Sequence, residues 1–250
     1  MSSATTERPR TSTLPVDTAK QLAITEYART AELLEALPPA AWSLRTECPA
    51  WDVRQMAAHV LGMGHMASSL RDQIRQQRAA RRRGGVFIDA LTALQVDERS
   101  AMGPEEIVRD YAQTWPKAAR ARFRTPRFVR KRTLPDPETV GGIPEAWTIG
   151  FLVETVLTRD VWMHRIDVCR AVGVVPVLTQ EHDGVLVADV VAEWAARHGQ
   201  PCRLTLTGPA GGQWTFGTGG PTLELDAVQF CRTLAGREPA QGLLDVEVPF

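Results

Sequence analysis

The sequence carries no excess charge of either sign, since its 250 residues include 29 basic and 29 acidic side chains. Without net charge, the chain has no general attraction for nucleic acid, for an anionic membrane surface or for a strongly charged partner. It also lacks any apolar run close to the roughly 20 residues that cross a bilayer. We therefore predict small-molecule partners, no nucleic acid and no membrane, and a monomer or a homodimer.

Cysteines are few and scattered, and they form no C-x-x-C motif or other paired spacing. They are Cys48, Cys169, Cys202 and Cys231. This usage favours a reducing, cytoplasmic setting. Internal repeats, a G-x-S-x-G motif and a phosphate-binding glycine loop are also absent. The sequence therefore gives no sign of a solenoid, of an activated serine or of a nucleotide site.

Apolar residues recur at helical spacing in four long segments of the first two thirds of the chain. These predicted helices cover 17–37, 52–70, 104–123 and 148–172. The stretch 81–103 is poorly patterned, apart from a basic, solvated helix end at 81–83. Residues 124–147 are rich in Pro and Gly, so we expect a long loop there.

The pattern changes after residue 176, where short alternating stretches are typical of strands. We predict a helix over 179–198, three short strands, a helix capped by Asp226 and an edge strand in the tail 243–250. The predicted fold class is α + α/β. Its parts are a disordered lead-in at 1–15, a four-helix bundle at 16–175 and a small mixed α/β domain at 176–250.

Two polar residues interrupt the apolar face of the fourth predicted helix. Asp160 and His164 lie four positions apart, so they share one face. Burying both without partners would cost several kcal/mol. Three arrangements remove that cost: hydrogen bonds to each other or to the backbone, an acid/base couple, or a bound metal. Asp167, one turn further on, is a candidate acceptor for His164 or a partner for an arginine of the same helix.

A third polar residue faces inward from the second predicted helix. The inner face of that helix contains Met56, His59, Met63, Met66 and Leu70. His59 can therefore meet Asp160 and His164 if the two helices are neighbours. Two imidazoles and one carboxylate leave positions open for water or substrate, as expected of a catalytic zinc site. The same ligands also suit iron(II), so ligand type alone does not fix the metal.

Several stretches carry a family resemblance. TECPAWDVR at 46–54 and RDVWMHRID at 159–167 closely resemble the mycothiol-dependent maleylpyruvate isomerase family of actinobacteria, whose amino-terminal part is a DinB-like four-helix bundle. GPAGG at 208–212 and LAGR at 234–237 are similar to the family's small carboxy-terminal α/β domain. The resemblance implies that His59, Asp160 and His164 are metal ligands and that Arg237 belongs to the active site. The isomerase carries glutamate at the position of Asp160.

The resemblance further implies an enzyme that uses zinc, or another divalent metal, together with mycothiol. A metal favours the thiolate at neutral pH. That thiolate either adds to the cis double bond of a maleylpyruvate-like substrate and leaves again, or stays attached, as in a thiol transferase. Two alternatives remain: a non-catalytic ligand-binding or scaffold protein on the same fold, and a metal-dependent hydrolase that uses hydroxide.

Overall fold

The computed structural model describes residues 8–250, which form two compact units. The helical unit comprises Val16–Pro126 and Asp160–Pro176. The mixed unit comprises residues 8–15, together with Arg127–Arg159 and Val177–Phe250. These units differ from the predicted domains at 16–175 and 176–250, since residues 127–159 belong to the same compact unit as the carboxy-terminal residues. The predicted domain boundaries therefore stay a prediction. Within residues 8–250, no helix is both long and apolar enough to cross a membrane.

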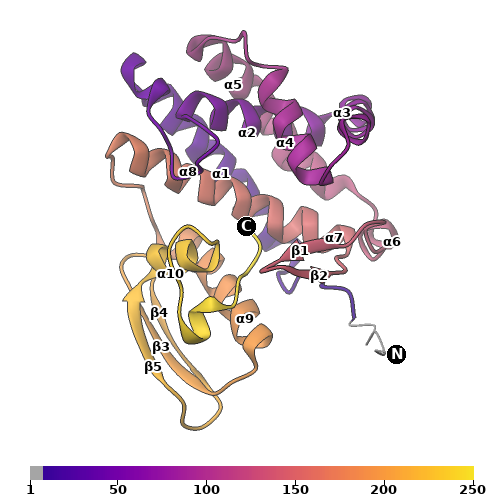
Figure 1. Ribbon diagram of the computed structural model, residues 1–250. Helices are drawn as coiled ribbons and strands as arrows, with labels where there is room; N and C mark the ends of the chain where they lie inside the picture. The colour runs from indigo at the N-terminus through magenta and orange to yellow at the C-terminus, as the bar shows by residue number, and fades with distance from the viewer. Residues whose placement is uncertain (1–7) are drawn as a thin grey trace. The chain divides into compact units, whose positions relative to one another are not determined.

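Four long helices build the helical unit (Figure 1). They are α1 (Val16–Ala36), α2 (Val53–Ser68), α5 (Pro104–Ala121) and, from Asp160 onward, α8 (Leu157–Val172). One apolar core joins them, to which Tyr27, Leu61, Tyr111 and Val161 contribute. The predicted bundle is therefore confirmed. A helix that buries one apolar stripe gains most of its stability from such a shared core.

The start of α2 is fixed by local hydrogen bonds. The Asp52 carboxylate accepts from the Gln55 backbone N–H at 2.7 Å, and the Gln55 side chain accepts from the Asp52 N–H at 3.0 Å. This capping box satisfies two backbone donors that would otherwise lack partners. It sets the rotational phase of α2, and hence the direction in which His59 points.

Two helices that the sequence did not reveal pack against α2. They are α3 (Leu70–Arg83) and α4 (Phe87–Asp97), which contact each other as well as α2. The predicted helix at 52–70 therefore ends at Ser68, and the poorly patterned stretch 81–103 contains α4. The periodicity was obscured because polar side chains lie on the inner faces: Gln76 of α3 and Gln95 of α4 are both fully buried.

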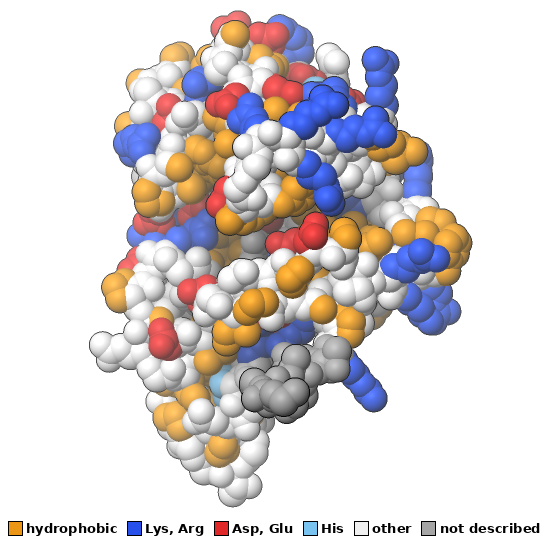
Figure 2. Space-filling view, turned by 45° about the vertical axis from the view of Figure 1, so that its right-hand side comes forward, with side chains coloured by type: hydrophobic (Ala, Val, Ile, Leu, Met, Phe, Trp, Pro, Cys, Tyr) orange, Lys and Arg blue, Asp and Glu red, His pale blue; other side chains and the backbone are white. Residues whose placement is uncertain are grey.

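The basic end of α3 is exposed to solvent. Figure 2 shows Lys and Arg side chains projecting from the upper part of the face that it displays. Arg83 binds Asp97 at 2.7 Å, and the Arg81 guanidinium lies 5.5 Å from the centre of the Phe87 ring. As expected from the sequence, these arginines form a solvated helix end.

The mixed unit contains a three-stranded sheet in the order β4-β3-β5. Its strands are β3 (Cys202–Thr207), β4 (Gly212–Phe216) and β5 (Thr222–Asp226), with β3 antiparallel to β4 and parallel to β5. Helix α10 (Ala227–Leu234) packs on β3, β5 and α9 (Val185–His198). The small mixed α/β part is confirmed. The predicted edge strand at 243–250 is wrong, since a 3₁₀ turn, Gly242–Asp245, begins a tail without strand pairing.

The predicted loop at 124–147 is also wrong in part. It contains α6 (Arg127–Arg130) and a hairpin of β1 (Glu138–Val140) and β2 (Ile143–Glu145). Strands of three residues are too short to produce a recognisable alternation. The helix predicted over 148–172 is interrupted, because α7 (Ile149–Phe151) and a π-helical turn, Leu152–Val156, precede α8.

The predicted lead-in at 1–15 lies only partly within the described chain. Residues 1–7 fall outside the described residues, whereas the Arg10 backbone N–H donates to the Ala146 carbonyl at 2.8 Å. The Thr148 N–H in turn donates to the Arg10 carbonyl at 3.0 Å. This part of the segment is therefore hydrogen-bonded, in contrast to the disorder that its composition predicted.

A buried network of charges connects the elements of the mixed unit. Arg159 binds Asp189 and Glu193, each at 2.6 Å, and Arg197 binds Glu193 at 2.7 Å and also pairs with Glu145. The Arg159 side chain is only 1% exposed. Because each buried guanidinium faces carboxylates, the desolvation of these charges is compensated.

Candidate metal centre

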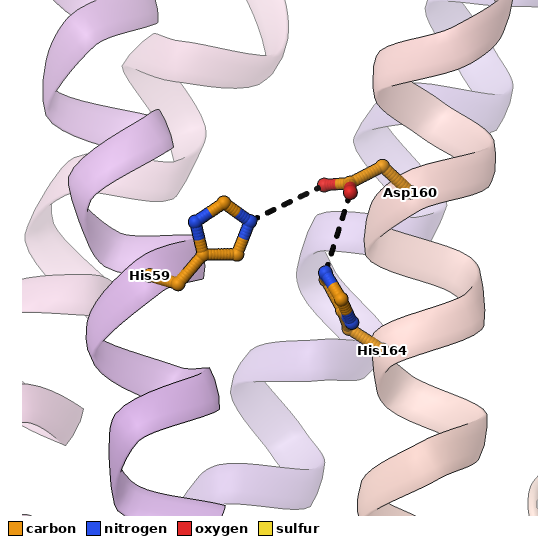
Figure 3. Close-up of side chains that lie close together, drawn as sticks. All are labelled: His59, Asp160 and His164. Carbon is orange, nitrogen blue, oxygen red and sulfur yellow. Dashed lines mark ion pairs between the residues drawn. The ribbon is translucent and has the colours of Figure 1, made fainter. Parts of the chain in front are cut away.

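His59, Asp160 and His164 come together inside the helical unit. His59 projects from α2, and the other two project from one face of α8 (Figure 3). One Asp160 oxygen lies 3.3 Å from His164 Nε2, and the other lies 3.9 Å from His59 Nε2. The three ligand atoms lie within 4.8 Å of one another. The structure therefore brings together the three residues that the sequence singled out.

The site is enclosed by protein on several sides. His59 is 2% exposed and His164 is 8% exposed, whereas Asp160 is half-buried. The Trp51 ring, just before α2, lies 4.9 Å from the His59 ring and 5.9 Å from the His164 ring, measured between centroids. Packing of this kind restricts rotation of both imidazoles and keeps their inner nitrogens directed at Asp160.

The outer ring nitrogens face acceptors as well. His59 Nδ1 lies 2.8 Å from Gln95 Oε1, and His164 Nδ1 lies 3.5 Å from the carboxylate of Asp167, which is fully buried. The His59 contact is a hydrogen bond, as is common for the second nitrogen of a metal-binding histidine, whereas His164 Nδ1 approaches Asp167 without forming a hydrogen bond within the described residues. The Asp167 position that the sequence indicated is therefore confirmed as close to His164.

This donor set fits a divalent cation. When Nδ1 carries the proton, each Nε2 offers a lone pair, and both lone pairs then face the carboxylate of Asp160. Metal bonds of about 2.0–2.2 Å place neighbouring ligand atoms of a tetrahedral site roughly 3.3–3.6 Å apart. His164 Nε2 lies 3.3 Å from one Asp160 oxygen, which is within that range, whereas His59 Nε2 lies 3.9 Å from the other oxygen, which is slightly outside it.

The electrostatics of the site couple Asp160 to both histidines. Burial would raise the pKa of Asp160, but His164 and His59 outweigh it and hold this pKa well below its usual range. Burial would lower the pKa of His164, but Asp160 and Asp167 raise it to about 9. Without metal, Asp160 and His164 therefore form an ion pair at neutral pH. A cation bound here would replace the proton of His164.

The amino-terminal part of the chain matches a family model described as the mycothiol maleylpyruvate isomerase N-terminal domain, over residues 25–169. The chain belongs to this family. The matched range contains all three candidate ligands, and the family resemblance that the sequence motifs carried is confirmed.

Solved structures of the family agree with this assignment. The chain is similar to a crystal structure of the mycothiol-dependent maleylpyruvate isomerase, with a TM-score of 0.57 and 16% identity over 90% of each chain. It is equally similar to a histidine-to-alanine mutant of that enzyme, with a TM-score of 0.57 and 15% identity over 90% of each chain. At these identities the likeness shows a shared fold. No curated protein matches the chain.

Arg237 lies in the mixed unit, three residues beyond the end of α10. Its Nη1 donates to the Ala235 carbonyl at 3.3 Å, and its side chain is partly exposed. A role for Arg237 in binding substrate therefore stays a prediction.

The sequence did not indicate that Gln95 contacts the site. Gln95 stands between two apolar residues, Leu94 and Val96, in a stretch without clear periodicity. A fully buried glutamine needs hydrogen-bond partners, which is the signal that could have marked it. The sequence likewise did not indicate that Trp51 contacts both His59 and His164.

Proposed function

We propose that this protein is a metal-dependent, mycothiol-using enzyme that isomerises the cis double bond of a maleylpyruvate-like substrate. The observation that carries the proposal is the convergence of His59, Asp160 and His164 in the bundle of a maleylpyruvate isomerase family member. In this proposal the three residues hold a divalent metal, for which zinc is the first candidate.

A divalent metal in this site would favour the thiolate form of mycothiol at neutral pH. The three protein ligands leave at least one coordination position open. Asp160 offsets only part of a dication's charge, so the site keeps a positive charge that attracts an acidic substrate. Both imidazoles are largely removed from water, which strengthens electrostatic interactions with them.

The isomerisation needs no net transfer of atoms. The thiolate sulfur adds to one carbon of the conjugated cis double bond, and the electron pair moves into the adjoining carbonyl group. The resulting carbon–carbon single bond rotates. Expulsion of the thiolate then restores the double bond in the trans form. In this scheme Arg237 binds a substrate carboxylate, for which its planar guanidinium is suited.

Thiol transfer shares the first step of this reaction and differs only in whether the carbon–sulfur bond persists. Incubation of the zinc-loaded protein with mycothiol and a panel of electrophiles, followed by mass spectrometry, separates the two reactions. Rearranged, thiol-free product supports the isomerase. A persisting mycothiol adduct would refute the isomerase and support a transferase instead.

A parallel incubation with ester and amide substrates, without mycothiol, tests the non-thiol alternatives. A hydrolase would convert ester or amide substrates without mycothiol, whereas a ligand-binding or scaffold protein would show no turnover. Metal analysis of protein purified without chelators supplies the second test. Less than about one equivalent of transition metal in folded protein would overturn the proposed site.

We also propose that the protein works in the cytoplasm, as a monomer or a homodimer. None of the four cysteines forms a disulfide, which is typical of a reducing compartment.

A further inference from the structure

A chain of buried hydrogen bonds leads away from the candidate metal centre. His59 Nδ1 lies 2.8 Å from Gln95 Oε1, and Gln95 Nε2 lies 2.9 Å from Gln76 Oε1. Gln76 Nε2 lies 3.1 Å from the carbonyl oxygen of Gly62 on α2. Both glutamines are fully buried, so these contacts are not in competition with bulk water.

The direction of this chain is fixed at its far end. The Gly62 carbonyl can only accept a hydrogen bond, so the Gln76 amide must present its nitrogen there and its oxygen to Gln95. Gln95 then directs its nitrogen at Gln76 and at Met63 Sδ, which is 3.2 Å away, and its oxygen at His59. Because that oxygen also only accepts, the proton of the neutral His59 ring must lie on Nδ1.

We propose that Gln95 is a positioning residue that selects the metal-binding tautomer of His59. This inference rests on the proposed function, in which His59 binds a metal through Nε2. Figure 3 shows Nδ1 of the His59 ring turned away from Asp160, while Nε2 faces it. With its proton held on Nδ1, the neutral ring presents a lone pair on Nε2. A ring in the other tautomer would direct an N–H at the metal position.

The close approach of α4 to α2 depends on a glycine. A methyl group on Gly62 would lie 2.7 Å from both Cβ and Cγ of Gln95, closer than atoms can pack. Glycine at this position therefore lets the Gln95 side chain reach its place beside α2. The helix pair α3 and α4 thus has a function within the site: it supplies the two amides that orient His59.

Two substitutions test this role. Gln95→Leu removes the acceptor that faces His59, and Gln76→Leu leaves that acceptor in place but frees the Gln95 amide to turn over. Gln73→Leu is the matched control, because Gln73 is an exposed glutamine of α3. The His59 tautomer is measured by ¹⁵N NMR of the imidazole nitrogens in metal-free protein. Zinc affinity is measured by competition with a chelator, and circular dichroism verifies folding.

We expect Gln95→Leu to weaken zinc binding about 10–100-fold, as substitutions behind a metal ligand commonly do. The NMR spectrum should show a smaller population of the Nδ1-protonated ring. Gln76→Leu should shift both readouts in the same direction, although Gln76 does not touch His59. Gln95→Glu, which retains an acceptor for the Nδ1 proton, should restore the tautomer that Gln95→Leu loses.

Unchanged tautomer populations in folded Gln95→Leu and Gln76→Leu would overturn the inference. A change of the same size in Gln73→Leu would overturn it too. If Gln95→Leu does not fold, Gln76→Leu decides. Failure of the parent protein to bind zinc would refute the proposed function, whereas the tautomer of metal-free His59 would still test the role of Gln95.

Discussion

Replacement of His59 by alanine separates a metal ligand from an ordinary buried histidine. His59 is 2% exposed, and its removal leaves Gln95 Oε1 without the ring donor in the protein interior. An unsatisfied buried acceptor costs about 1–3 kcal/mol. For a chain of this length, each kcal/mol lowers the midpoint of thermal unfolding by about 2–4 °C. We therefore expect metal-free His59→Ala to unfold roughly 2–12 °C below the parent protein.

The effect of metal distinguishes the two roles. A metal present at about 100 times its dissociation constant stabilises the folded parent protein by about 2.7 kcal/mol, because it binds the folded state preferentially. That corresponds to a rise of about 5–11 °C in the unfolding midpoint. His59→Ala retains only Asp160 and His164, so the same metal concentration should give almost no rise.

The assay is calorimetric unfolding with and without zinc, together with measurement of bound metal. His65→Ala is the matched control on the same helix, because the His65 ring binds Asp110 at 3.0 Å and Arg99 at 3.2 Å. His65→Ala should lower the stability of the protein, yet zinc should still raise its unfolding midpoint as it does in the parent protein. A rise in His59→Ala as large as that of the parent would refute the assignment of His59 as a ligand.

Substitutions at three further positions test the fold and the second unit. Glu26→Ala removes the buried carboxylate that binds Arg165 at 2.6 Å. We therefore expect the free energy of unfolding, measured with urea, to fall by about 3–5 kcal/mol. Burial would raise the pKa of Glu145, but Arg197 and Arg10 outweigh it and lower this pKa. The stabilisation by Glu145 should therefore be complete above its unfolded pKa of about 4.3 and be lost as pH falls below it. Urea unfolding of the parent protein should therefore show a loss of stability at low pH that Glu145→Gln does not show. An equal pH dependence of the two proteins would refute the role of this pairing. Arg237→Lys and Arg237→Ala should both raise KM in steady-state kinetics with metal content unchanged, and an unaltered KM would exclude Arg237 from substrate binding.

The bundle helices and the three candidate ligands could be predicted from the sequence because their signals are local. Apolar spacing of three and four residues defines a helix face, and it placed His59, Asp160 and His164 on inner faces without any knowledge of packing. The capping box at Asp52 likewise needs only residues three positions apart. These features depend on interactions within one helix, so the sequence alone determined them.

Contacts between distant parts of the chain were decided by the tertiary structure. Gln95 lies 36 residues from His59, and nothing in the local pattern of α4 indicates that its amide faces an imidazole. The short β1–β2 hairpin is likewise held by pairing rather than by an alternating pattern. Burial selects such arrangements, because a polar group removed from water must find its partner wherever packing places one. The sequence therefore determined which residues could bind a metal, and packing decided which buried amide orients one of them.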